Sequence, residues 1–340
     1  MKKLLAVLIS ACMLLSCPVC AGAVAQAELP EATEASTDFC IVESIDTDGR
    51  TVRTYSADEQ HDGTTALTAE NDYADVRALL LELGMNQEFV DSQTDEELRF
   101  YSTCVEISCS TEYYRTDEDG NTAYVDKNTA LAAVEEVSAL GRNASRATTA
   151  SYVEVDTFAA HQGSGRYMLT VTADWLTTPF LRAGEAIGVC ASSMAIETSG
   201  MSGYYSYDVV QTVNGVVTTS NDVRASLSSS AEFASVEGWA GGGAAFTFPE
   251  DIGVTGGSLT YSDFRAYFSC FGNVTNPTLA TNFNVIGSYS HATFVFVGDV
   301  ALVFSLTNSE PYFCVGIEGS LSLVSSQDKY KSAIYVSYVP

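Results

Sequence analysis

The sequence predicts a mainly β protein, in which a small α+β domain over residues 39–142 precedes an antiparallel β-sandwich over residues 151–340. The later region consists of strand-like runs separated by turn signals such as Asn214-Gly215, with no helical period of useful length. The earlier region has apolar residues at helical spacing and holds most of the acidic side chains. This shift in composition predicts two domains, joined by a linker at residues 143–150.

Residues 1–27 have the anatomy of a cleavable secretory signal. Lys2 and Lys3 provide a positive start, an apolar run extends from Leu4 to Leu15, and small residues precede Ala27. The apolar run is too short to span a bilayer, which needs about 20 residues in a helix. We therefore expect cleavage after Ala27 and a secreted protein that works outside the cytoplasm.

A second reading of the same segment leads to a lipid anchor. Leu14-Leu15-Ser16-Cys17 resembles the lipobox of bacterial lipoproteins, in which the cysteine is lipidated. The alternative is thus a surface protein anchored through Cys17. In either case residues 28–38 are expected to form a disordered acidic leader, and no membrane span is expected after signal removal.

The charge balance argues against nucleic acid as a partner. The chain has 43 acidic and 16 basic residues, a formal net charge of −27. Nucleic-acid binding depends on lysine and arginine side chains that neutralise phosphates. The acidic surface is expected to serve solubility outside the cell, and no dinucleotide or phosphate-loop fingerprint predicts a cofactor.

Six cysteines follow the signal, three in each expected domain. Several lie in apolar runs, where a free cysteine behaves as a small buried hydrophobe. We expect mostly free thiols, and Cys104 with Cys109 as the pair best placed for a disulfide. No metal site is expected, because the cysteines have neither paired spacing nor a neighbouring histidine.

Residues 39–142 contain clear local signals for helices and hairpins. Gly84 stands where a helix over residues 73–83 would end, and Asn86 is placed to cap a short second helix. Thr94 and Glu97 have the spacing of a capping box that opens a third helix. We also expect a hairpin within residues 39–55, strands at 105–115 and 122–125, and a helix over 128–141.

The run from Val76 to Val90, followed by Glu96-Glu97-Leu98 and a hairpin, resembles a segment of exported Gram-positive bacterial proteins that have no assigned activity. The resemblance covers about residues 73–126 and is a packing pattern. It implies an extracellular setting and no particular chemistry.

The later region is predicted to supply roughly nine to eleven strands of a sandwich. The run from Ala292 to Leu306 is apolar on both faces, as expected of a central pair of core strands. The candidate strands are 152–156, 166–176, 185–191, 204–212, 231–237, 244–248, 258–270, 290–298, 300–307, 313–324 and 332–338.

No catalytic motif stands out. The three histidines are His61, His161 and His291, and a serine nucleophile beside His161 would lack the elbow motif of serine hydrolases. Paired carboxylates in residues 151–340 remain an alternative, as a hydrolase that acts on polysaccharides.

Aromatic residues in the later region suggest recognition at a surface. The candidates for ligand binding are Trp175, Trp239, Tyr204, Tyr205 and Tyr207. Aromatic rings beside asparagine and aspartate suit sugars or protein partners, although the same residues would also pack a sandwich. The predicted function is a non-catalytic, extracellular binding or adhesion protein for a glycan or protein.

Overall fold

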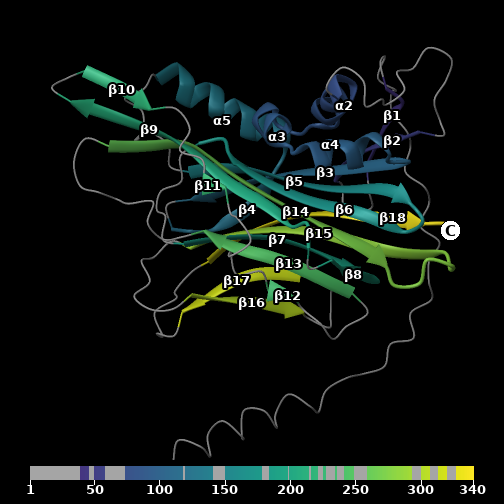
Figure 1. Ribbon diagram of the computed structural model, residues 1–340. Helices are drawn as coiled ribbons and strands as arrows, with labels where there is room; N and C mark the ends of the chain where they lie inside the picture. Colours follow the sequence, from purple (N-terminus) through teal and green to yellow (C-terminus); the bar gives the residue numbers. More distant parts are fainter. Residues whose placement is uncertain are drawn as a thin grey trace, which may run out of the picture. The chain divides into compact units, whose positions relative to one another are not determined.

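The protein is mainly β, and its strands form antiparallel sheets, as the sequence predicts (Figure 1). The structure is a computed structural model. It describes residues 39–45, 50–57, 73–117, 119–140, 150–177, 184–197, 199–213, 216–220, 225–226, 234–235, 241–248, 259–292, 300–306, 313–319 and 327–340.

The largest sheet has 11 strands, of which eight follow the order β1-β2-β3-β5-β6-β14-β9-β10. Strand β4 pairs with β3, β8 with β14, and β11 with β9. The bounds are β1 Ile41–Ile45, β2 Thr51–Ser56, β3 Glu106–Asp117, β4 Thr122–Val125, β5 Ala150–Gly163, β6 Arg166–Trp175, β8 Met194–Ile196, β9 Ser202–Val213, β10 Val216–Ser220, β11 Ala225–Ser226 and β14 Leu259–Val274.

A second sheet has five strands in the order β12-β13-β7-β15-β18, and β16 pairs with β17 as a separate hairpin that contacts β7, β15 and β18. The run from Ala292 to Leu306 is therefore not a central core pair, because β15 ends at Ala292 and β16 pairs with β17. The bounds are β7 Gly184–Ser192, β12 Ala234–Ser235, β13 Gly241–Phe248, β15 Thr281–Ala292, β16 Val300–Leu306, β17 Phe313–Gly319 and β18 Gln327–Tyr338.

The residues predicted to begin and end the helices do so in the structure. The helices are α2 Ala74–Leu83, α3 Gln87–Ser92, α4 Asp95–Ser102 and α5 Lys127–Leu140. Gly84 ends α2 in the left-handed conformation, with φ at 109°. The Asn86 side chain accepts a hydrogen bond from the Glu88 amide at the start of α3, and Thr94 forms a capping box with Glu97 at the start of α4.

The predicted division into two domains is wrong. Strand β3 pairs with β5 from Glu106 opposite His161 to Asp117 opposite Ala150, so the large sheet runs through both expected domains. A single unit extends from Glu31 to Pro340. The difference in composition instead marks a helical layer, which has to bury its apolar side against a sheet built from strands of both regions.

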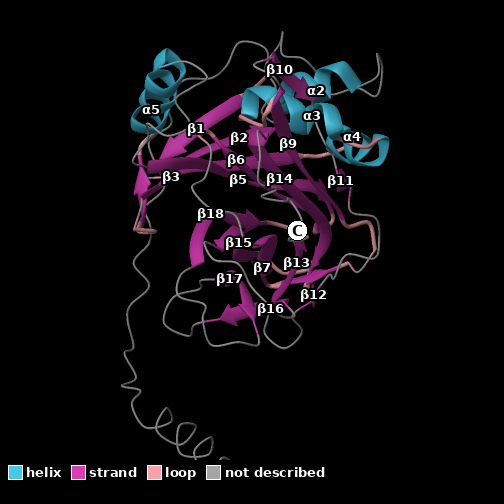
Figure 2. Ribbon diagram, turned by 90° about the vertical axis from the view of Figure 1, so that its left-hand side faces the viewer, coloured by secondary structure: helices cyan, strands magenta, loops and turns pink. Residues whose placement is uncertain are grey.

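Helices α2, α3 and α4 and the five-stranded sheet lie on opposite sides of the large sheet (Figure 2). Each side of the large sheet has an apolar core. One core fills the space between the large sheet and the five-stranded sheet, with Leu169, Val171 and Trp175 of β6 among its members. The other lies under helices α2, α3 and α4, where Met168 of the same strand contributes. The alternation along β6 follows from the two-residue period of a strand. The sandwich thus carries a third, helical layer.

The residues of the expected signal and leader, 1–38, lie outside the described part of the chain. Among the helices that are described, none is long and apolar enough to cross a membrane.

Candidate functional site

The aromatic residues predicted to form a binding surface are core residues instead. Trp175 is 3% exposed, and its Nε1 donates a hydrogen bond to the Tyr289 hydroxyl at 2.9 Å. Tyr204 and Tyr205 are each 8% exposed, and they belong to different cores because neighbouring strand residues face opposite sides.

The remaining two candidates do not restore the predicted surface. Tyr207 is half-buried, and its ring lies parallel to that of Tyr205 with centroids 6.0 Å apart. Trp239 lies outside the described residues. The prediction of an exposed cluster is wrong for Trp175, Tyr204 and Tyr205, since large aromatic rings contribute most to stability when they are buried.

The expected disulfide is absent, because Cys104 and Cys109 are both buried free thiols. Cys104 Sγ donates to the Phe100 carbonyl at 3.3 Å, and both residues belong to the core beneath the helices. Burial raises the pKa of both thiols well above the usual range, which makes them poor nucleophiles. Cys40 and Cys270 are free thiols as well.

His161 serves packing rather than proton transfer. Its ring stacks on Tyr167 with the centroids 4.4 Å apart, and it meets the edge of Tyr338. Burial lowers the pKa of the imidazole. His61 is outside the described residues, and His291 lies in β15 opposite Asp328 of β18.

The face of the large sheet beneath the helices changes from apolar to charged along the strands. Residues opposite one another on β3, β5, β6, β14 and β9 form rows across this face. In order they are Ile107, Ala160, Met168 and Phe271; then Cys109, Phe158, Thr170, Ser269 and Ser202; then Thr111, Asp156, Thr172, Tyr267 and Tyr204; and last Tyr113, Glu154, Asp174, Arg265 and Ser206.

Helix α4 is joined to the middle of this face through Glu97, which is 5% exposed. Its Oε1 accepts hydrogen bonds from the hydroxyls of Tyr267 at 3.0 Å, Ser269 at 2.8 Å and Ser202 at 2.5 Å. Its Oε2 accepts from the backbone amide of Thr94 at 2.8 Å and from the Thr94 hydroxyl at 2.9 Å. A buried carboxylate is tolerated when both oxygens are hydrogen-bonded in this way.

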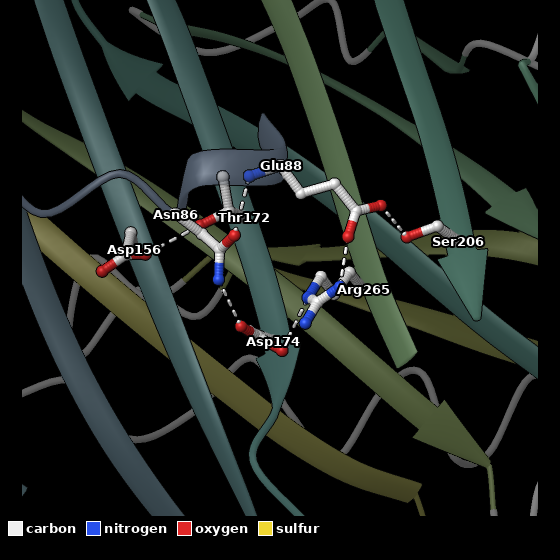
Figure 3. A network of polar contacts seen from close by, with 7 residues as sticks. All are labelled: Asn86, Glu88, Asp156, Thr172, Asp174, Ser206 and Arg265. Atoms are coloured by element: carbon white, nitrogen blue, oxygen red, sulfur yellow. Dashed lines mark hydrogen bonds and ion pairs between the residues drawn. The ribbon is translucent and has the colours of Figure 1, made fainter. Parts of the chain in front are cut away.

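Helix α3 is joined to the charged end of the face. Glu88 forms an ion pair with Arg265 and accepts a hydrogen bond from the Ser206 hydroxyl at 2.6 Å (Figure 3). Asn86 donates to Asp174 Oδ2 at 2.9 Å, and Asp174 Oδ1 lies 3.4 Å from Arg265 Nε. The residue that caps α3 therefore also attaches the helix to the sheet.

Two further carboxyl groups of β5 lie beside this network. Thr172 donates to Asp156 Oδ2 at 2.9 Å, while Asp156 Oδ1 is buried without a hydrogen bond of ordinary length. Glu154 lies directly opposite Asp174 on the neighbouring strand. We call Glu88, Glu154, Asp156, Asp174 and Arg265 the carboxyl layer.

Three acids of the carboxyl layer, Glu154, Asp156 and Asp174, have raised pKa values, mainly because they are buried. Burial, with the neighbouring carboxylates, raises the pKa of Glu154 well above its usual range, and burial likewise raises that of Asp156. Burial also raises the pKa of Asp174 to about 6, although Arg265 opposes this rise. These acids therefore exchange protons close to neutral pH.

The carboxyl layer does not have the geometry of a metal centre. Within the described ranges, no group of three or more His, Cys, Asp or Glu side chains is arranged to hold a metal ion. Arg265 and the amide of Asn86 occupy the positions around Asp174 where a cation would bind.

An uncharged polar surface lies at the end of the five-stranded sheet, where β18 finishes and β15 begins. We call Tyr335, Ser337, Asn282, Asn284 and Ser192 the terminal face. Tyr335 is 62% exposed and lies opposite Asn284, while Ser337 lies opposite Asn282. The backbone N–H of Asn284 donates to Ser192 Oγ at 3.1 Å, which extends the face to β7.

The terminal face is not among the features expected from the sequence, although the alternating pattern of β18 indicates it. In β18 the residues Tyr330, Ser332, Ile334, Val336 and Tyr338 are buried, so the strand period places Tyr335 and Ser337 on the outer side. An exposed tyrosine in an otherwise regular amphipathic strand was the available indication.

The chain matches no protein-family model and no curated protein. Among solved structures it is similar to one titled "Pore forming protein", at 7% identity and a TM-score of 0.23, covering 68% of this chain and 93% of that one. It is also similar to "Clostridium perfringens delta-toxin", at 6% identity and a TM-score of 0.20, covering 68% of this chain and 91% of that one. TM-scores this low do not establish a common fold.

Proposed function

We propose that this protein is exported and binds a neutral saccharide outside the cell, without catalysis, through the terminal face. The observation that carries the proposal is the exposed ring of Tyr335 among amide and hydroxyl side chains on adjacent strands. A tyrosine ring offers an apolar face to a sugar ring and a hydroxyl to its polar rim. Asparagine and serine supply both donors and acceptors for sugar hydroxyls.

The charge of the face supports an uncharged ligand. The chain has a net charge of −27, yet none of the five residues of the terminal face is charged. A cationic partner would be recognised by carboxylates, and an anionic partner by lysine or arginine. A neutral polyol needs neither.

The position of the face also suits recognition. Strands β15 and β18 pair along 12 residues of each, from Thr281 opposite Tyr338 to Ala292 opposite Gln327. Phe283 and Val336, the inward neighbours of the face, are 2% and 3% exposed and hold both strands on the core. Binding groups on a rigid scaffold lose little conformational freedom when a ligand is bound.

For the alternative of a polysaccharide hydrolase, Glu154 and Asp174 are a candidate pair of carboxylates among the described residues. They lie opposite each other on β5 and β6, so their side chains are neighbours on one face of the sheet. Asp174, however, is engaged by Asn86 of the helical layer and by Arg265. The carboxyl layer therefore resembles a structural joint more than a cleft for substrate, and we favour binding.

Export is proposed from the first 27 residues of the sequence, which read as a secretory signal. Mass spectrometry of the mature protein distinguishes the two routes. A chain that begins at Glu28 supports release, and a lipid on Cys17 supports anchoring. A chain that keeps Met1 in cells would contradict export.

The experiment that tests the function is a glycan-array screen of the mature protein from residue 28 to residue 340. Binding to neutral saccharides is expected for the wild type and is expected to disappear in Tyr335→Ala. Tyr124→Ala is the matched control, because Tyr124 is 54% exposed on a different sheet. Binding that survives Tyr335→Ala, or no binding to any neutral glycan, would contradict the proposal.

A further inference from the structure

Helix α3 and its capping residue contact the sheet through members of the carboxyl layer. Glu88 binds Arg265 and Ser206, and Asn86 binds Asp174. Helices α2 and α4 flank α3 in the chain. Three residues, 84–86, separate α2 from α3, and two residues, 93–94, separate α3 from α4. A change at the charged end of the face therefore acts on the whole helical layer, which we define as α2, α3 and α4.

The carboxyl layer has an excess of acids. Four carboxyl groups share one arginine that contacts two of them directly, Glu88 and Asp174. The titratable and charged groups that face these acids from the surrounding elements are Arg53 of β2, Cys109 and Tyr113 of β3, Lys127 of α5, and Asp263 of β14. The two cations among them act at longer range, so the layer is not neutral when every acid is ionised.

The acids also cannot move apart within the folded sheet. Glu154 and Asp174 are opposite each other in register, and Asp156 lies two residues along the same face from Glu154. Strand pairing fixes all three backbones, so the strands themselves cannot relieve repulsion between the side chains. The repulsion is relieved when a proton binds, or when the covering helix moves away and admits water.

We propose that the carboxyl layer is a protonation-controlled latch that holds the helical layer on the large sheet. With a proton bound in the layer, α3 stays docked through Asn86 and Glu88. When the layer is fully ionised, α3 and its neighbours open locally while the two sheets remain folded. The latch is closed in mildly acidic surroundings and loosens as the pH rises through neutrality.

The direction follows from proton linkage. An acid whose pKa is raised in the folded state binds protons more tightly there than in the open state, where its pKa is about 4. Closure is therefore fully favoured at low pH and weakens as the pH rises through the folded pKa values. For Asp174 this occurs near pH 6, and Glu154 and Asp156 shift in the same direction.

Hydrogen exchange of the full mature chain at pH 5.5 and pH 8.5 tests the latch, with rates corrected for the chemical dependence of exchange on pH. The reporter is the Val90 amide of α3, which bonds to the Asn86 carbonyl at 3.0 Å. The reference is the backbone of β15 in the other sheet. We expect opening at Val90 to increase at least tenfold between the two pH values, with no matching increase in β15.

Two variants assign the effect to the layer. Glu154→Gln and Asp156→Asn each remove one ionisable group and are expected to reduce the increase to less than threefold. Glu135→Gln on α5, an exposed residue, is the matched control and should behave as the wild type. The proposal is overturned if Val90 and β15 respond equally in the wild type, or if both variants keep the full increase. The wild-type comparison decides the matter even where a variant does not fold.

Discussion

Glu97 shows at the scale of one residue how the protein accommodates a buried charge. Its two oxygens accept five hydrogen bonds, two from the cap of its own helix and three from hydroxyls of the sheet. The capping box could be read from the spacing of Thr94 and Glu97. The three hydroxyls come from β9 and β14, more than 100 residues later, and no local pattern announces them.

The variant Glu97→Gln tests how much the hydrogen bonds to the Glu97 carboxylate contribute to stability. In the glutamine, an NH2 group that cannot accept a hydrogen bond replaces one carboxylate oxygen. This group would face either the Thr94 backbone amide, which is also a donor, or the three hydroxyls that donate to Glu97. Hydrogen bonds to charged groups contribute about 1.5–3 kcal/mol, so we expect a loss of about 2 kcal/mol in the free energy of unfolding. Urea denaturation measures it. Glu96→Gln, an exposed neighbour, is the control and should change stability by less than about 0.5 kcal/mol.

At Gly287 the two sheets approach each other closely. A Cβ at this position would lie 2.3 Å from Thr157 Oγ1 and 2.7 Å from Val171 Cγ2. Because strands β5, β6 and β15 are fixed by pairing, Gly287→Ala should destabilise the protein by about 1–3 kcal/mol. Thermal melting measures the loss, and a melting temperature equal to that of the wild type would show that the sheets are not packed this closely.

At the scale of elements, the sequence predicts the helices better than it predicts strand β15, which carries part of the terminal face. Caps and glycine stops are local, so α2, α3 and α4 follow from Gly84, Asn86 and Thr94. Of strand β15, the expected strands include only the last residues, 290–292. Its outward Asn282 and Asn284 and its inward Gly287 weaken the apolar alternation that Phe283, Val285 and Tyr289 provide.

The start of α3 gives a prediction that combines capping with charge. Asn86→Asp keeps an oxygen to cap the helix but replaces the amide donor to Asp174 with another carboxylate. Repulsion is weak while the layer carries protons and strong once it has lost them. We therefore expect Asn86→Asp to lower the melting temperature more at pH 8 than at pH 5.

Asn86→Ala is the comparison for this experiment. It removes the cap and the contact with Asp174 without adding charge, so its cost of about 1 kcal/mol should depend less on pH. An Asn86→Asp variant whose destabilisation is the same at both pH values would contradict the electrostatic account of this joint.

At the scale of the whole molecule, composition predicts the class of fold but misplaces its boundaries. The acidic, helix-rich region looks like a domain because its charge and periodicity differ from those of the later region. In the structure it supplies both a helical layer and three strands of the path through the large sheet, β1, β2 and β3. Residues 118–149 separate β3 from β5 in the chain. The composition of the two regions does not indicate that these strands pair, or in which register.

A shared sheet has a measurable consequence. Since β3 pairs with β5 along the full length of β3, the helical layer and the sandwich should unfold together at pH 5.5, where the carboxyl layer is protonated. Calorimetry should show one transition. Two resolved transitions, with residues 39–142 melting separately, would support two domains instead.

The central claim is that the terminal face binds a neutral saccharide. Its most direct test is isothermal titration of the mature protein with the best glycan from the array, using Tyr335→Ala and Tyr124→Ala. The account predicts at least tenfold weaker binding for Tyr335→Ala, which corresponds to about 1.4 kcal/mol, and unchanged binding for Tyr124→Ala. Equal affinities for Tyr335→Ala and the wild type would contradict it.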